Sequence, residues 1–142
     1  MSARELTRLT VEPGPDGVLA LAAELPMAIS GEGPALAPLP AGPPDYVDRI
    51  VAAVRPDDPS APLEHNDVAV VVATSGSMGE PRGVLLSGSA LIASAKASDS
   101  RLGGPSRWVM ALPAHHVAGL QVLVRAHLSG IPPIPLDSVG GA

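Results

Sequence analysis

The chain contains no cysteine and no phenylalanine, and it has only one tryptophan, one tyrosine and one lysine. Without cysteine it can form no disulfide and use no thiol for catalysis or metal binding. That permits a cytoplasmic location, where we expect the protein to reside. Because aromatic side chains are so scarce, the 46% of residues that are hydrophobic must build the core mainly from Ala, Val and Leu.

Clusters of positive charge and long apolar runs are also missing. The formal net charge is −5 and no basic run occurs, which argues against nucleic acid as a partner. No apolar run reaches the roughly 18–20 residues of a membrane span. The segment Ser2–Arg8 has no hydrophobic region typical of a signal peptide. We therefore expect neither a nucleic-acid nor a membrane partner.

Residues 1–66 form an N-terminal segment rich in proline and glycine, of which the whole chain has 17 and 15. It ends in a polar, proline-rich connector over residues 55–66. Asp16 and Asp45 are expected to cap helices, and Pro26 to end or kink the first one. The elements expected here are a strand at 9–11, a helix at 17–24, an edge strand at 34–40 and a helix at 46–54.

From residue 67 to 142 the pattern changes to strands that alternate with helices. Ser87 is expected to cap a helix at its N-terminus and Gly130 to end another. The expected strands cover 68–73, 83–86, 108–112 and 131–136, and the expected helices cover 88–101 and 117–128. This alternation predicts a layered α/β fold with a mainly parallel sheet and flanking helices, forming one domain with the N-terminal segment.

Residues 73–83 read Ala-Thr-Ser-Gly-Ser-Met-Gly-Glu-Pro-Arg-Gly and lie between two apolar runs. Glycines let backbone N–H groups approach an anion, hydroxyls add donors, and a guanidinium matches phosphate oxygens. The loop is neither a Walker A motif nor a dinucleotide fingerprint. An ordinary connection remains the alternative. The candidate phosphate-binding residues are Thr74, Ser75, Gly76, Ser77, Gly79 and Arg82.

A second candidate segment, Leu112-Pro113-Ala114-His115-His116-Val117-Ala118-Gly119, ends an expected strand and begins an expected helix. Ligands in α/β sheets collect at the carboxyl ends of strands, so a histidine here can face a pocket. Two solvated histidines are the alternative. A metal site is less favoured, because adjacent histidines point in different directions and no Cys or H-x₃-H pattern completes a ligand set.

Both segments resemble signatures of the adenylate-forming family, which includes acyl-CoA synthetases, luciferases and peptide-synthetase adenylation domains. Its phosphate loop reads T-S-G-S/T-T-G-x-P-K-G, and this chain departs from it at Met78 and Arg82. Its L-P-x-x-H-x-x-G element is matched by His116 and Gly119. The strings Arg107-Trp108 and Leu112 to Arg125 are most similar to actinobacterial o-succinylbenzoate–CoA ligases of menaquinone biosynthesis.

The resemblance implies a two-step reaction on a small-molecule carboxylate. ATP, with Mg²⁺, converts the acid to an acyl-adenylate, and coenzyme A then displaces AMP to form a thioester. The loop residues would hold the ATP phosphates, with Glu80 a solvated charge. His116, Gly119 and Gln121 would line the acid pocket, and Arg125 and His127 would be helix surface.

The later motifs of that family, including its magnesium-binding Glu and catalytic Lys, do not occur in this sequence. We therefore expect an N-terminal fragment that does not complete catalysis alone. Such a fragment is expected to self-associate or to pair with a complementary chain. Two alternatives stay open, namely a decayed nucleotide- or phosphate-binding module and an assembly domain whose loop binds nothing.

Overall fold

The computed structural model describes residues 4–75 and 79–136. Four strands form its main sheet in the order β1-β2-β3-β4. The first three strands are parallel, and β4 runs antiparallel to β3. The predicted α/β fold with a mainly parallel sheet is confirmed. The strands are β1 (Leu6–Val11), β2 (Ala35–Pro40), β3 (Val68–Ser75) and β4 (Pro81–Ser87).

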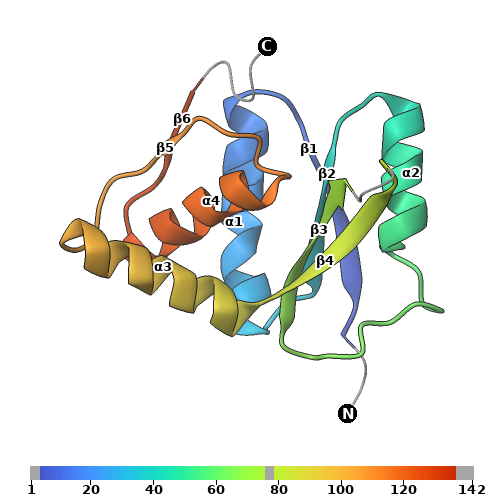
Figure 1. Cartoon of the computed structure of the whole chain (residues 1–142), viewed down its shortest axis with the longest axis horizontal. Helices are drawn as coiled ribbons and strands as arrows, with labels where there is room; N and C mark the ends of the chain where they lie inside the picture. The colour runs from blue at the N-terminus through green and yellow to red at the C-terminus, as the bar shows by residue number, and fades with distance from the viewer. Residues whose placement is uncertain (1–3, 76–78, 137–142) are drawn as a thin grey trace.

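Helices cover both faces of this sheet (Figure 1). On one side lie α1 (Pro15–Ser30), α3 (Gly88–Leu102) and α4 (Val117–Ser129), and on the other lies α2 (Pro44–Val54). The larger hydrophobic cluster fills the space beneath α1, α3 and α4, with fully buried Leu21, Leu25, Leu91 and Leu120 near its centre. A smaller cluster lies under α2 and includes Leu6, Val68 and Val71.

Two short strands, β5 (Val109–Met110) and β6 (Ile134–Pro135), pair in parallel as a separate small sheet. Both are shorter than the strands expected at 108–112 and 131–136. A two-stranded sheet without further neighbours supplies little stability of its own. This agrees with the short pairing of β5 and β6, which joins only two residue pairs. Over the described residues, no helix combines the length and apolar character needed to cross a membrane.

Helix α1 continues through Pro26 to Ser30, so the expected end of this helix near residue 24 was wrong. A proline inside a helix removes one hydrogen bond and costs about 3 kcal/mol. Leu25 and Ala28 are almost fully buried on either side of it, and burying one leucine contributes about 2 kcal/mol. The buried face of α1 therefore offsets most of the cost of the proline, and the helix runs one turn further.

Strand β2 lies between β1 and β3, so its prediction as an edge strand was wrong. All six of its residues are buried. Its register with β3 is limited to Leu36 opposite Val70, before Pro38 and Pro40. The prolines thus lie beyond the paired part of the β2–β3 ladder, where a missing N–H costs no hydrogen bond to β3. Their register partners, Leu9 and Val11, lie on β1.

Two of the helix ends expected from the sequence are found in the structure. Ser87 Oγ accepts a hydrogen bond from the Ala90 N–H at 3.1 Å, and Gly130 ends α4 with a φ of 72°. Both expectations are confirmed. The expected caps at Asp16 and Asp45 were wrong. Each helix begins earlier, at a proline, so these residues lie within the first turns of α1 and α2.

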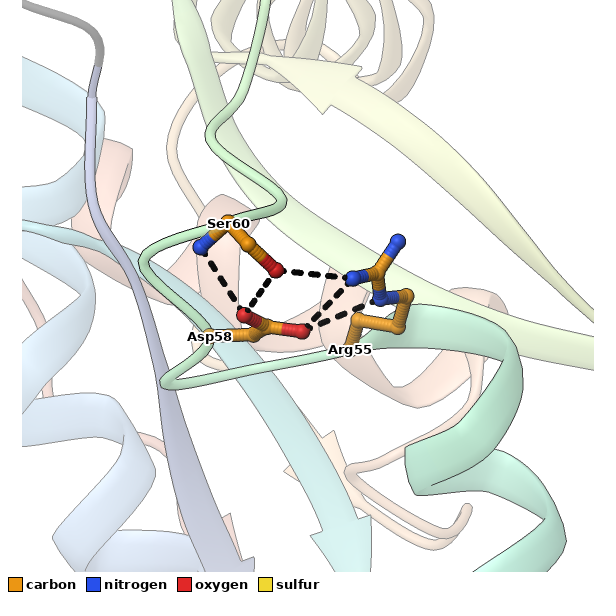
Figure 2. A network of polar contacts seen from close by, with 3 residues as sticks. All are labelled: Arg55, Asp58 and Ser60. Carbon is orange, nitrogen blue, oxygen red and sulfur yellow. Dashed lines mark hydrogen bonds and ion pairs between the residues drawn. The ribbon is translucent and has the colours of Figure 1, made fainter.

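The connector over 55–66 covers the outer edge of β1. The Asp57 N–H donates to the Leu6 carbonyl at 2.7 Å, and Asp57 pairs with the Arg8 guanidinium at 2.8 Å. Figure 2 shows how the turn is held, with Asp58 accepting hydrogen bonds from Arg55 and Ser60. These bonds lower the pKa of the Asp58 carboxyl to about 2. A covered edge cannot pair with another chain.

Arg4 joins three parts of the fold at the amino ends of β1, β2 and β3. Its guanidinium donates hydrogen bonds to the carbonyls of Ala28 and Gly33 at 2.6 and 2.9 Å. It also donates to the carbonyls of Asn66 and Val68. Burial lowers the pKa of Arg4, and the charge of Asp67 partly offsets this. One side chain thus joins the end of α1, the turn before β2 and the start of β3.

Candidate functional site

The candidate phosphate loop is the tip of the β3–β4 hairpin. The register places Thr74 opposite Arg82 and Ser75 opposite Pro81. Gly79 has a φ of +78°, a left-handed conformation that favours glycine. Gly76, Ser77 and Met78 lie outside the described residues. The hairpin therefore places a hydroxyl and a guanidinium side by side on neighbouring strands.

Solvent reaches this part of the hairpin. Ser75, Gly79 and Arg82 are exposed, and Thr74 is half-buried. Within the described ranges, no carboxylate forms an ion pair with the Arg82 guanidinium. Glu80 is exposed two residues away. An anion approaching the hairpin would thus meet a positive charge that no described acidic group neutralises.

The second candidate segment lies at the same edge of the sheet. Parallel β1, β2 and β3 all have their carboxyl ends at this edge. A cavity of about 300 Å³ opens there between Val11 at the end of β1, Pro40 at the end of β2 and the loop at 113–115. Both candidate segments thus lie where open α/β sheets bind their ligands.

The two adjacent histidines of this segment lie in different environments. His116 directly precedes α4 and is exposed, whereas His115 is half-buried and lines the cavity. Their rings meet edge to face with centroids 4.4 Å apart. Burial, with a smaller contribution from the nearby His116, lowers the pKa of His115 to about 4. His115 is therefore a neutral imidazole at pH 7.

Sequence reasoning selected His116 and gave His115 no role. The available signal was that adjacent side chains at a strand–helix junction point in different directions, so one of the pair faces inward. The sequence does not reveal which of them does so. That depends on how the loop packs against the start of α1, whose Gly14 and Val18 also line the cavity.

Gly119 is buried in the first turn of α4, where the helix crosses its own preceding loop. A Cβ atom at this position would lie 2.0 Å from the Pro113 carbonyl oxygen and 2.9 Å from Met110 Cε. Only glycine allows this approach. The residue therefore has a packing role whether or not it lines a pocket.

Gln121 and Arg125 lie one turn apart on α4, and Arg125 lies beside Trp108. The Arg125 guanidinium carbon is 5.1 Å from the centroid of the Trp108 ring. Gln121 Oε1, Arg125 Nε and Trp108 Nε1 are buried without a hydrogen-bond partner among the described residues. Arg125 is half-buried, so its prediction as mere helix surface was wrong, while His127 is exposed as expected. The signal in the sequence that could have indicated this arrangement was the spacing of four residues between Gln121 and Arg125, which places both on one face of the helix.

Metal-binding chemistry finds little support in this part of the chain. No group of three or more His, Cys, Asp or Glu residues within 4–75 and 79–136 could hold a metal ion. Mg²⁺ prefers carboxylate and phosphate oxygens, and the described part of the phosphate hairpin offers only Glu80. These residues therefore do not fit a protein-bound magnesium.

Comparison with known proteins gives consistent matches. A model of the family described as AMP-binding enzyme matches residues 14–137. The probable 2-succinylbenzoate–CoA ligase of Mycobacterium tuberculosis (strain ATCC 25618 / H37Rv) is 39% identical over 117 residues, which are 82% of this chain and 28% of that relative. The 2-succinylbenzoate–CoA ligase of Bacillus velezensis is 35% identical over 89 residues, 61% of this chain and 18% of that relative. The chain thus spans less than a third of these curated relatives.

Solved structures share the fold. The complex of VinN with L-aspartate superposes with a TM-score of 0.67 at 16% identity, covering 93% of this chain and 48% of that one. The O-succinylbenzoate coenzyme A synthetase (MenE) from Bacillus subtilis, in complex with ATP and magnesium ion, gives a TM-score of 0.56 at 18% identity. That match covers 97% of this chain and 46% of the MenE chain.

Proposed function

Because this chain belongs to the AMP-binding enzyme family, we propose that it carries the ATP-phosphate loop and part of the acid pocket of an ATP-dependent carboxylate–CoA ligase. The observation that carries the proposal is the β3–β4 hairpin. It presents the exposed Arg82 guanidinium opposite Thr74, at the edge of the sheet where the parallel strands end. Ser75 and Gly79 lie beside them on the same hairpin.

In the proposed first step, a carboxylate oxygen of the acid attacks the α-phosphorus of ATP. The bond from that phosphorus to the pyrophosphate oxygen breaks, so negative charge builds on the leaving group. Hydroxyl groups of Thr74 and Ser75, the guanidinium of Arg82 and backbone N–H groups near Gly79 would stabilise that charge. Gly76 and Ser77 are assigned to the same role from the sequence alone.

In the proposed second step, the thiolate of coenzyme A attacks the acyl carbon and AMP leaves with the bonding electrons, giving a thioester. We assign His116, Gly119 and Gln121 to the acid pocket. Gln121 Oε1 is buried without a hydrogen-bond partner among the described residues, so a hydrogen bond from a bound acid or water would satisfy it. The names of the relatives favour 2-succinylbenzoate as the acid, and hence a role in menaquinone biosynthesis.

The complete reaction is proposed for an assembly larger than these residues. The matched region is 28% of the Mycobacterium tuberculosis relative. The small β5–β6 sheet and the residues just after its strands expose four large apolar side chains, Val109, Leu112, Ile134 and Leu136, at 39–47%. We propose that this surface binds the polypeptide that completes the ligase. Pairing with a second copy is the alternative, and size-exclusion chromatography with light scattering distinguishes the two.

A second candidate function is a nucleotide- or phosphate-binding module without catalysis. It is favoured by Met78, which replaces a hydroxyl-bearing threonine of the family signature with a bulkier apolar side chain. In that case Met78→Thr should strengthen nucleotide binding markedly, since it restores one donor to the loop. An assembly domain whose loop binds nothing would respond to neither Met78→Thr nor Arg82→Ala.

Calorimetric titration of Mg-ATP into the purified chain tests the proposal. Removing a charge-assisted hydrogen bond costs about 1.5–3 kcal/mol, so Arg82→Ala should weaken binding about tenfold or more. Arg101→Ala is the matched control, because it removes an equally exposed arginine at the end of α3. Equal affinities for the two variants, or no binding by any form, would contradict a functional phosphate loop.

A further inference from the structure

The cavity at the carboxyl ends of β1 and β2 shares the loop before α4 with the proposed acid pocket, but none of the residues assigned to the ligase reaction lines it. No residue of the β3–β4 hairpin and none of α4 lines it. Its walls come from the end of β1, the start of α1, the end of β2 and the loop before α4. The apolar side chains that line it include Val11, Val18, Pro40, Ala41, Pro113 and Ala114.

The charge of this cavity does not suit the acid, ATP or coenzyme A, which are all anionic. The ionisable side chains on its wall are those of Glu12 and His115, and no Lys or Arg lines it. Glu12 is exposed and His115 is uncharged at pH 7. A carboxylate or a phosphate would therefore meet one negative charge and no positive one, which opposes its binding.

The polar groups nevertheless suit a neutral ligand. An uncharged imidazole donates one hydrogen bond and accepts another, and a carboxylate accepts only. No hydrogen bond joins the His115 ring to another side chain in the described part of the protein, so its ring nitrogens are available. A volume of about 300 Å³ is at the lower end of small-molecule pockets, which favours a ligand of one or two rings.

We propose that this cavity binds an uncharged ring compound that bears a hydroxyl group. The ring packs against the apolar walls, and the hydroxyl bonds to the His115 imidazole. Such a molecule is distinct from ATP, from the acid and from coenzyme A. The cavity is thus a second ligand site, next to the loop that leads into α4.

Phenol is the probe, and benzoate, which has the same ring and a negative charge, is the matched comparison. Titration is followed by the backbone amide signals of Ala41 and Ala114 and by the ring signals of His115 in nuclear magnetic resonance spectra. We expect saturable phenol binding with shifts confined to the cavity, and benzoate binding at least tenfold weaker. No saturable shift with phenol, or equal binding of the two probes, would overturn the proposal.

Variants distinguish phenol binding in the cavity from non-specific phenol binding. Ala41→Phe places a ring in the cavity and should abolish phenol binding, with Ala41→Val as the milder variant if the larger side chain prevents folding. His115→Leu keeps the bulk and removes the hydrogen bond, which should weaken binding about threefold to tenfold. His127→Leu changes an exposed histidine of α4 and should have no effect. Phenol binding that all these variants retain would contradict the assignment.

Discussion

Replacing Gly119 by alanine tests whether this glycine is required for packing. The residue lies in the first turn of α4, directly against the loop that precedes the helix. An added Cβ would lie 2.0 Å from the Pro113 carbonyl oxygen and 2.7 Å from the Pro113 carbonyl carbon. Ordinary van der Waals contact between such atoms needs about 3.5 Å, so the backbone must move by more than 1 Å.

The expected cost of Gly119→Ala follows from two opposing effects. Overpacking in a well-packed region costs typically 1–3 kcal/mol, and a clash with backbone is at the upper end of this range because no rotamer relieves it. Alanine has a better helix propensity than glycine by about 1 kcal/mol. The free energy of unfolding should therefore fall by about 2 kcal/mol, which lowers Tm by roughly 4–8 °C in a chain of this size.

Thermal and urea denaturation followed by circular dichroism measure this loss. Gly103→Ala is the matched control, since Gly103 has a φ of 88° and open space around its Cβ direction. It should show only the strain of a left-handed alanine, about 1 kcal/mol. An unchanged Tm for Gly119→Ala would refute the packing argument and leave a direct role in ligand binding as the explanation for this glycine.

Three further predictions concern stability. Arg4→Ala removes the charged donor shared by the carbonyls of Ala28, Gly33 and Val68 and should lower the free energy of unfolding by about 2 kcal/mol or more. Arg8→Ala, which breaks an exposed ion pair, should cost less than about 1 kcal/mol in the same urea titrations. The pKa of His115 is about 4 in the folded protein against an ordinary 6.5, so the unfolded chain binds this proton first. Stability should therefore fall as the pH drops from 6.5 to about 4, and His115→Leu, compared with the wild type across this range, should lack that part of the fall.

The sequence predicted those elements whose signals are local. Ser87 caps α3 and Gly130 ends α4 because a side-chain oxygen or a left-handed backbone acts within one turn. The central place of β2 and the passage of α1 through Pro26 could not be predicted. Both depend on partners distant in sequence, namely the strands on either side of β2 and the buried face of α1.

In the candidate site, too, local features could be predicted from the sequence and tertiary features could not. The strand before the phosphate loop and the helix after the histidines are periodic segments, so their junctions could be located from the sequence. The antiparallel pairing that brings Arg82 opposite Thr74 is a tertiary property, as is the inward position of His115 rather than His116. A motif indicates which residues gather at a site, but the packing of each side chain decides its environment.

The loop at 113–116 forms a shared wall between two proposed sites, and this has a testable consequence. The Pro113 carbonyl touches the Gly119 position on one side, while Pro113 and His115 line the cavity on the other. A Cβ at Gly119 should push this backbone toward the cavity, so phenol binding should weaken in Gly119→Ala at a temperature where the variant stays folded. The β3–β4 hairpin contributes nothing to this wall, so Mg-ATP affinity should stay within twofold of the wild type. Loss of phenol binding and of Mg-ATP binding together would mean that the substitution unfolds the domain. Unchanged phenol binding would show that the two sides of the loop are not coupled.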